Sequence, residues 1–307
     1  MKPHRILVTG GAGFIGSNLV DSLLENGFEV KVLDNLSSGK IENLPENIGL
    51  IKGDIRDIGT VKNALKDVEI VYHLAAQASV SVSMKEPILD ASVNAIGTLN
   101  LLDQSFKAEI DNFVFSSTGG AIYGEPNNIP PNEASSEEPI SVYGVSKLAA
   151  EKYVKFYEKL GLNCSILRFA NVYGPRQDPY GEAGVISIFL NNIKNDKPIH
   201  VFGDGSSSRD YVFVKDITKV AIEILKKPSP QPLNIGSNKE ILLNDLIKNI
   251  KSTVNKNFEV LYIDERKGDV KNIYLDCSKL RDHLGWIPHT PLSDGLKEVW
   301  SWMNSRG

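Results

Sequence analysis

A tyrosine and a lysine four residues apart are the side chains in this sequence best suited to chemistry. Tyr143 and Lys147 belong to the segment YGVSK, near the start of a helix predicted over 142–160. Residues four apart share one helical face, and a nearby cation lowers the pKa of a tyrosine from its ordinary value of about 10. Tyr143 is therefore a candidate base for a substrate hydroxyl. An ordinary solvent-exposed helix face would give the same pattern. Neighbouring motifs must therefore show whether this pair is suited to catalysis.

Glycines at a fixed spacing follow the first predicted strand. Gly10, Gly13 and Gly16 have G-x-x-G-x-x-G spacing, one residue wider than the common dinucleotide-binding fingerprint. Glycine permits a tight turn and lets backbone N–H groups approach a pyrophosphate, which then faces the positive end of the next helix. A tight turn without a ligand would need the same glycines.

Two aspartates at strand ends make the dinucleotide interpretation more specific. Asp34 ends the second predicted strand, where a carboxylate accepts hydrogen bonds from adenosine ribose hydroxyls and repels the extra phosphate of NADP. Because Arg does not follow Asp34 directly, the sequence favours NAD. Asp54 follows the third strand and can reach the adenine amino group, although a helix N-cap is an alternative role.

Short β-type runs alternate with helical patterns, which indicates βαβ units and an α/β fold with a doubly wound parallel (Rossmann) sheet. The predicted strands are 5–9, 29–33, 48–52, 69–73, 112–116 and 163–168, and the longer helices are 14–25, 87–107 and 142–160. The polar stretch 125–139 is expected to be a surface loop. We expect an NAD-binding domain over 1–170, to which the chain can return, and a smaller, mainly substrate-binding lobe over 171–307.

Composition excludes several classes of partner. The net charge is -4 without a long Lys/Arg run, which argues against nucleic acid and anionic membranes. Cys164 and Cys277 lack CxxC spacing and the five histidines lack ligand spacing, so we expect no metal and a cytoplasmic location. No window has the apolar length of a membrane span.

With these motifs together, the chain resembles the extended short-chain dehydrogenase/reductases. Within them it resembles the NAD-dependent sugar-nucleotide epimerases and dehydratases, and most closely the UDP-glucose 4-epimerases. The resemblance covers nearly the whole chain and rests on TGGAGFIG (9–16), DNLSSG (34–39), GDIRD (53–57), HLAAQ (73–77), Asn94, SSTGGAIYG (116–124), YGVSK (143–147), RFANVYGPRQ (168–177), SRDYVFVKD (208–216) and RKGD (266–269).

The resemblance implies NAD as cofactor and assigns many residues to it. These are Gly10, Gly13, Phe14, Ile15, Gly16, Asp34, Asn35, Ser37, Ser38, Gly39, Asp54, Ile55, Leu74, Ala75, Ala76, Gln77, Asn94, Ser116, Tyr143, Lys147 and Phe169.

The resemblance also implies a mechanism, in which Tyr143 takes the proton of the sugar 4-hydroxyl while the C4 hydride moves to NAD. The 4-keto sugar then turns, and the hydride returns to its other face. Thr118 corresponds to the residue that hydrogen-bonds the reacting hydroxyl. Because its loop is one residue longer than the commonest form, Ser117 remains the alternative. His73 is expected to be structural.

Residues later in the chain are implied to bind the nucleotide. Asn171 is assigned to a phosphate, Arg209 and Arg266 to the two phosphates together, and Asp269 to the uridine ribose. Arg suits this role because its planar fork matches phosphate oxygens, although a surface ion pair is the alternative for each. Weaker candidates for the uridine pocket are Val185, Phe202 and Tyr211.

Differences within the family narrow the reaction to epimerisation. Dehydratases carry Thr-Asp-Glu where this chain has Thr118-Gly119-Gly120, and glycines cannot move the protons of a dehydration. UDP-glucose and UDP-galactose are the expected pair, which implies galactose metabolism. Ile273 occupies a gate position that a bulky Tyr closes to N-acetylated sugars, so UDP-N-acetylglucosamine stays open. UDP-glucuronate also stays open, with Lys85 or Arg176 to hold its carboxylate.

Two further expectations concern non-catalytic roles and assembly. A dinucleotide-binding sensor would resemble the fold but usually lacks the Tyr143 and Lys147 pair, which this chain has. The family usually forms homodimers through two long helices, here 87–107 and 142–160.

Overall fold

The structure is a computed structural model that describes residues 4–180, 184–264 and 271–305. The chain folds into two compact units. Unit 1 comprises the chain up to Gly124, together with Ser136–Phe169 and Thr218–Leu233. Unit 2 comprises Glu125–Ser135, Ala170–Ile217 and the chain from Asn234 onward.

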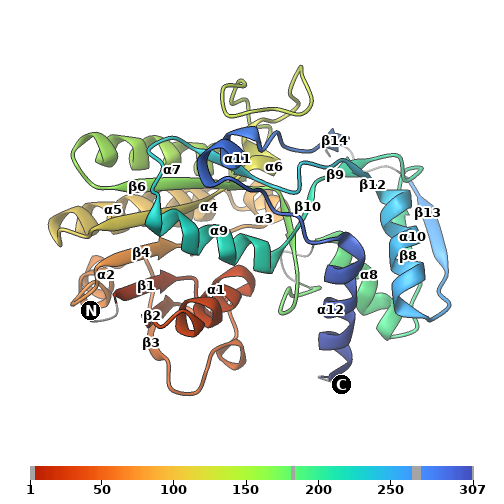
Figure 1. Ribbon diagram of the computed structural model, residues 1–307, viewed down its shortest axis with the longest axis horizontal. Coiled ribbons are helices and arrows are strands. Elements are labelled where there is room, and N and C mark those ends of the chain that lie inside the picture. Colours follow the sequence, from red (N-terminus) through yellow and green to blue (C-terminus); the bar gives the residue numbers. More distant parts are fainter. Residues whose placement is uncertain (1–3, 181–183, 265–270, 306–307) are drawn as a thin grey trace. The chain divides into compact units, whose positions relative to one another are not determined.

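A seven-stranded sheet forms the centre of unit 1 (Figure 1). Its order is β11-β6-β5-β4-β1-β2-β3, and every neighbouring pair from β6 to β3 is parallel. The strands are β1 (Arg5–Thr9), β2 (Glu29–Asp34), β3 (Gly49–Lys52), β4 (Ile70–His73), β5 (Asn112–Thr118), β6 (Cys164–Phe169) and β11 (Leu233–Ile235). The predicted doubly wound sheet is confirmed, and β11 is the strand that the sequence pattern did not predict. The order reverses between β1 and β4, where such sheets bind their ligands.

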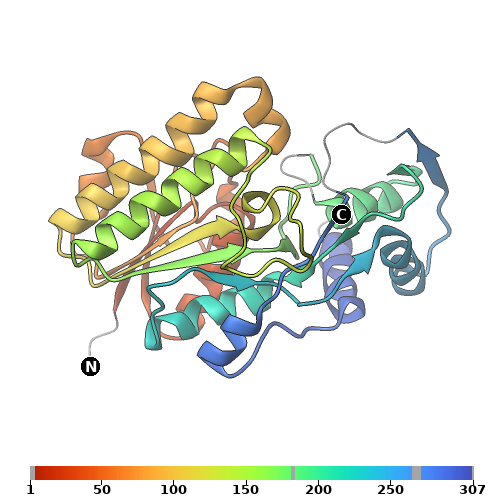
Figure 2. The ribbon, with the colours of Figure 1, turned by 90° about the horizontal axis from the view of Figure 1, so that it is seen from above.

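Helices cover both faces of this sheet. They are α1 (Phe14–Glu25), α2 (Ile58–Ala64), α3 (Val80–Lys85), α4 (Pro87–Ala91), α5 (Thr98–Lys107), α6 (Gly119–Ile122), α7 (Val142–Lys159) and α9 (Val214–Lys226), with a 3-10 turn η1 (Ile41–Asn43). Helices α5 and α7 lie side by side along one face (Figure 2), where Leu102 and Ala150 join the same apolar core as Phe113. Helices α1 and α9 cover the opposite face, where the hydroxyl of Tyr72 donates to the carbonyl oxygen of Ala221 at 2.6 Å.

The segment predicted as one helix over 87–107 departs from α-helical geometry in its middle. Between α4 and α5 the residues Ser92–Gly97 form a π-helical turn, η2. Such turns often mark functional sites, because the wider turn re-aims the side chains within it. Asn94, which the family resemblance assigns to the cofactor, lies in this turn.

Unit 2 is a mixture of small sheets and helices. Its elements are β7 (Asn171–Tyr173), α8 (Val185–Lys194), β8 (Ile199–Phe202), β9 (Ser208–Arg209), β10 (Tyr211–Phe213), β12 (Ile241–Leu242), α10 (Leu243–Val254), β13 (Val260–Ile263), β14 (Asn272–Ile273), α11 (Ser278–Leu284) and α12 (Leu292–Ser305). Asp210 is a buried anchor here, since its carboxylate accepts from the backbone nitrogens of Ser237 at 2.7 Å and Leu275 at 3.3 Å. Burial raises the pKa of this carboxyl group.

Candidate active site

Backbone groups form a cradle at the turn between β1 and α1. Gly10 has a φ of +70°, and a Cβ there would lie 2.6 Å from the backbone nitrogen of Ala75. A Cβ on Gly16 would overlap the carbonyl oxygen of Gly10. The N-cap of α1 is Gly13, without a side-chain hydrogen bond, so side chains do not cap the first-turn N–H groups. This backbone fits the pyrophosphate of a dinucleotide, as the glycine spacing predicts.

The carboxylate of Asp34 is fixed at the end of β2, beside that cradle. One oxygen accepts from the backbone nitrogen of Ala12 at 2.9 Å, and the other accepts from that of Leu36 at 2.8 Å. A Cβ on Gly39 would press against both Ala12 and Asp34, which explains the glycine there. Each carboxylate oxygen has a second lone pair, so the group can still accept hydrogen bonds from a ribose.

Asp54 is held by its neighbours after β3. The guanidinium of Arg56 donates to both of its oxygens, at 2.8 and 2.7 Å, and Asn35 donates to one at 3.0 Å. The hydrogen bonds from Arg56 hold the pKa of Asp54 well below its ordinary range. The N-cap of α2 is Asp57, whose carboxylate accepts from the backbone nitrogens of Gly59 and Thr60. The capping alternative for Asp54 is therefore wrong.

The other residues predicted to bind NAD follow strands of the central sheet or open α1. Phe14 and Ile15 begin α1, Ser37 and Ser38 follow β2, Ile55 follows β3, Leu74, Ala75, Ala76 and Gln77 follow β4, and Phe169 ends β6. Gln77 is paired with Asn94, because the backbone nitrogen of Gln77 donates to the Asn94 amide oxygen at 2.9 Å. The Asn94 amide nitrogen donates to the Gln77 carbonyl oxygen at 2.7 Å.

Tyr143 and Lys147 both lie in the first half of α7, which begins where the Ser141 hydroxyl accepts from the backbone nitrogen of Gly144. Lys147 is buried, with 3% of its surface exposed. Its ammonium donates to the carbonyl oxygen of Ser116 at 2.6 Å and lies 4.3 Å from the centre of the Phe115 ring. A buried cation one helical turn from Tyr143 is the arrangement that the spacing predicts.

The end of β5 presents three hydroxyl residues in succession. Ser116 donates from its side chain to the carbonyl oxygen of His73 at 3.0 Å. Ser117 is buried, whereas Thr118 is partly exposed. The chain then turns directly into the short helix α6, which begins with Gly119.

His73 has a structural environment, as expected. Its ring nitrogens lie 2.8 Å from the hydroxyls of Thr9 and Thr98. Since the Thr98 hydroxyl donates to the carbonyl oxygen of Asn94 at 2.6 Å, it accepts from Nε2–H of His73. Burial, together with the charge of Lys147, lowers the pKa of His73 to about 3, so the ring is neutral at physiological pH.

The residues predicted to bind the nucleotide lie in unit 2. Asn171 on β7 is the register partner of Tyr211 on β10. The Arg209 guanidinium donates to the carbonyl oxygens of Ser208 at 2.7 Å and Lys271 at 3.0 Å. Burial raises the pKa of Tyr211 to about 12. Val185 begins α8 and Phe202 ends β8. The predicted residues Arg266 and Asp269 lie outside the described residues.

A buried ion-pair cluster beside the site was missed by the sequence reasoning. Arg168 is fully buried and donates to both carboxylate oxygens of Glu151, at 2.9 and 2.6 Å, and to Glu137. It also donates to the Tyr123 hydroxyl at 3.0 Å. Because Glu137 precedes α7 and Glu151 belongs to it, the cluster anchors this helix to β6. The charge pattern alone did not distinguish these residues from surface ones.

Comparison with known proteins places this arrangement in a family. Residues 6–236 match the NAD dependent epimerase/dehydratase family. The chain belongs to this family. The extended short-chain dehydrogenase/reductase resemblance that the motifs indicate is thereby confirmed.

Solved members of the family match along nearly the whole chain. The UDP-glucose 4-epimerase of Thermotoga maritima, solved with UDP-glucose, is 45% identical with a TM-score of 0.95, covering 98% of this chain and 99% of that one. The Thermus thermophilus UDP-glucose 4-epimerase, solved with NAD, is 39% identical with a TM-score of 0.92, covering 99% and 100%. A UDP-N-acetylglucosamine 4-epimerase from Methanobrevibacter ruminantium, solved with UDP-N-acetylmuramic acid, is 37% identical with a TM-score of 0.94, covering 100% of both.

Proposed function

We propose that this protein is an NAD-dependent isomerase that reversibly epimerises UDP-glucose and UDP-galactose at C4. The observation that carries the proposal is the full-length similarity to the Thermotoga maritima UDP-glucose 4-epimerase, at 45% identity and a TM-score of 0.95. The reaction is redox-neutral overall.

The site fits the cofactor at several independent points. The glycine turn before α1 leaves room for a pyrophosphate, and the carboxylate of Asp34 is positioned to accept from the adenosine ribose. When bound here, NAD would supply the acceptor for the C4 hydride and the donor that returns it. The negative charge of Asp34 favours NAD over NADP, because the additional phosphate would be repelled.

The chain's own residues move the proton. Tyr143 takes the proton of the 4-hydroxyl and gives it back after the sugar has turned. Lys147 favours the phenolate form of Tyr143 through its positive charge, which the Ser116 carbonyl holds in place. Thr118 orients the reacting hydroxyl. Its partial exposure supports it over Ser117, which is buried with 4% of its surface exposed.

The loop after Thr118 supports epimerisation over dehydration. Gly119 and Gly120 open α6 and carry no acid or base that could move a proton at C5 or C6 of a sugar. A non-catalytic sensor remains the alternative of another class, and the pair of Tyr143 and Lys147 argues against it.

The nucleotide is assigned to residues of unit 2 by the sequence resemblance. Arg209 neutralises a phosphate and Asn171 contacts one, while Val185, Phe202 and Tyr211 are candidates for the uridine. Arg266 and Asp269 complete the proposed set, for the second phosphate and the ribose. The polar contacts of Arg209 with two backbone carbonyls support this role, since they orient its guanidinium.

UDP-N-acetylglucosamine is the second candidate substrate. Ile273 on β14 is buried and is the register partner of Arg209. A branched aliphatic side chain there leaves more room than a Tyr would, and the Methanobrevibacter ruminantium relative at 37% identity is a UDP-N-acetylglucosamine 4-epimerase. UDP-glucuronate is the third candidate substrate.

Anomeric NMR tests the reaction. The purified protein is incubated separately with UDP-glucose, UDP-N-acetylglucosamine and UDP-glucuronate, first without and then with added NAD. Conversion of UDP-glucose to UDP-galactose is the expected result, and conversion of another sugar alone would change the substrate but keep the mechanism. If none reacts with NAD present, the epimerase proposal is wrong.

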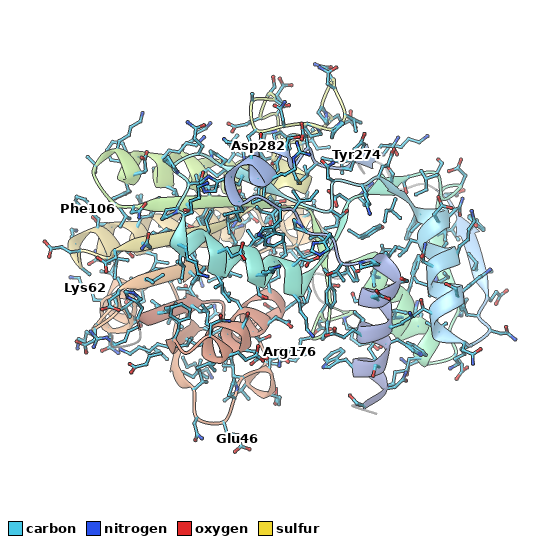
Figure 3. The ribbon with its side chains drawn as sticks, viewed as in Figure 1. Glu46, Lys62, Phe106, Arg176, Tyr274 and Asp282 are labelled. Carbon is cyan, nitrogen blue, oxygen red and sulfur yellow. The ribbon has the colours of Figure 1, made fainter. Side chains whose placement is uncertain are left out.

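The chain forms a homodimer in this proposal, through the outer faces of α5 and α7 and their neighbours. Apolar side chains are exposed there, including Ile88, Ile96, Phe106 (Figure 3), Val145 and Phe156. Light scattering of the wild type and of Phe156→Glu tests this, since a charge at a buried interface should yield monomers. A monomeric wild type at micromolar concentration would contradict it.

Location and pathway follow the same proposal. A cytoplasmic enzyme of galactose metabolism suits the two cysteines, Cys164 and Cys277, both of which are free and buried. None of the helices in the described parts of the chain combines the length and apolar character needed to cross a bilayer.

A further inference from the structure

A buried carboxylate on α4 accepts a hydrogen bond from α7 and has no role in the mechanism above. Asp90 on α4 has none of its surface exposed. It accepts from the Ser146 hydroxyl at 2.5 Å, the Gln77 side-chain amide at 2.7 Å and the Asn94 side-chain amide at 3.1 Å. All three donors are uncharged groups. Together they hydrogen-bond both oxygens of the buried Asp90 carboxylate.

The first of these donors belongs to the catalytic segment itself. Ser146 lies between Tyr143 and Lys147 in α7, and its oxygen is 3.0 Å from the carbonyl oxygen of Tyr143. The backbone nitrogen of Tyr143 donates to the buried hydroxyl of Ser83 at 3.1 Å. Both backbone groups of Tyr143 therefore contact serine hydroxyls, and one of these hydroxyls is held by Asp90.

The other two donors belong to the region that we assign to the cofactor. Gln77 follows β4 in the same loop as Ala75, against which the glycine turn at Gly10 is packed. Asn94 lies in the π-helical turn η2. Its side-chain amide accepts a hydrogen bond from the backbone nitrogen of Gln77 and donates one to the Gln77 carbonyl oxygen. One carboxylate thus connects α7 with the loop after β4 and with η2.

We propose that Asp90 is a positioning residue for the epimerisation, which fixes the Tyr143–Lys147 segment against the cofactor loop through Ser146 and Gln77. The inference rests on the proposed function. Asp90 acts by holding its neighbours in position, so the arrangement of its hydrogen bonds matters more than its charge. Misplacement of a reacting group by about 1 Å can cost about 100-fold in rate.

Substitutions at Asp90 separate geometry from charge. In Asp90→Asn, the amide oxygen can accept from Gln77 and Asn94, and the amide nitrogen can donate to the oxygen of Ser146. In Asp90→Ala, all three donors lose this acceptor. Ser146→Ala removes the contacts of this hydroxyl with Asp90, Asn94 and the Tyr143 carbonyl, and it leaves Asp90 its bonds from Gln77 and Asn94. Asp282→Ala on α11, an exposed carboxylate (Figure 3), is the matched control.

We expect Asp90→Ala to lower kcat about 10- to 100-fold while KM for the UDP-sugar changes less than about threefold. Asp90→Asn should recover most of the lost kcat, and Ser146→Ala should fall between the two. Asp90→Ala should also release NAD faster, as followed by separating free from bound nucleotide. Asp282→Ala should match the wild type in every measurement.

Several results would overturn the proposal. One is a folded Asp90→Ala that turns over and retains NAD like the wild type; another is an Asp90→Asn as defective as Asp90→Ala, which would indicate a role for the charge. If Asp90→Ala does not fold, unchanged kcat and NAD release in Ser146→Ala would overturn it. A wild type inactive on every UDP-sugar refutes the proposed function alone, because the NAD release rates of the variants still test the link to the cofactor loop.

Discussion

The ammonium of Lys147 and the backbone carbonyl of Ser116 form a 2.6 Å hydrogen bond that joins helix α7 to the end of strand β5. Ser116 is the register partner of Leu167 on β6, and its side chain donates to the carbonyl oxygen of His73 at the end of β4. The cation is therefore held by the end of a central strand, one helical turn from Tyr143.

Lys147→Met should abolish most activity without destabilising the fold. Methionine fills a similar volume but removes a charge that folding must desolvate, so we expect an unchanged or higher free energy of unfolding. We expect kcat to fall by about 100-fold or more, because the phenolate loses its cation. Urea unfolding and NMR turnover measure the two effects. A variant that loses both stability and activity would point to a structural lysine.

Tyr143→Phe should separate chemistry from binding. The substitution removes one hydroxyl and leaves the backbone contacts of residue 143 with Ser83 and Ser146 intact. We expect kcat to fall by about 100- to 10,000-fold, the range for loss of a general base. NAD content and UDP-sugar affinity, measured on the same preparation, should stay within about threefold of wild type. Full activity in Tyr143→Phe would transfer the base role to another residue.

His73 should make stability depend on pH below neutrality. Its folded pKa, lowered by burial to about 3, lies below the ordinary 6.5, so the unfolded chain takes up the proton first. The contribution of the neutral His73 ring to the free energy of unfolding is complete above pH 6.5. It falls by about 1.4 kcal/mol per pH unit as the pH drops toward 3. His73→Gln lacks this group. Between pH 7 and 5 the wild type should lose about 2 kcal/mol more than His73→Gln in urea unfolding. Parallel curves would contradict the prediction, because they would show that folding does not change the pKa of His73.

Asp34→Asn should weaken the preference for NAD. An amide can accept hydrogen bonds through one oxygen only, and it no longer repels a phosphate on the ribose. We expect NAD to bind about tenfold more weakly, since hydrogen bonds to charged groups are about twice as strong as neutral ones. NADP should bind more tightly than it does to the wild type. Calorimetry of the cofactor-free protein with both dinucleotides measures this, and an unchanged ratio of the two dissociation constants would count against the role of Asp34.

Much of unit 1 could be predicted because its signals are local. A run such as RILVT at Arg5–Thr9 is a strand in the structure at the same residues, and the glycine turn follows it directly. The helix over 142–160 ends within one residue of its predicted bound. The short strand β11 was missed, because three residues carry no periodic pattern to distinguish them from a loop.

The supporting polar residues could not be predicted, because their partners are distant in the sequence. Asp90 and Ser146 are separated by 56 positions, and each is of a type normally found in water. The π-helical geometry of η2 around Asn94 likewise is not encoded in a local apolar period. The residues predicted to contact ligands lie in recognisable motifs, whereas Asp90 and Glu151 lie outside them.

The return of the chain to the central sheet has a consequence for protein synthesis. Strand β6 is buried at all six residues and has β11 as its outer neighbour. A ribosome makes β6 well before it reaches Leu233, so a nascent chain would carry β6 as an unpaired edge during that interval. Unpaired edges invite pairing with other chains. Stalled or truncated chains that stop short of β11 should therefore depend on chaperones more than the full-length chain does.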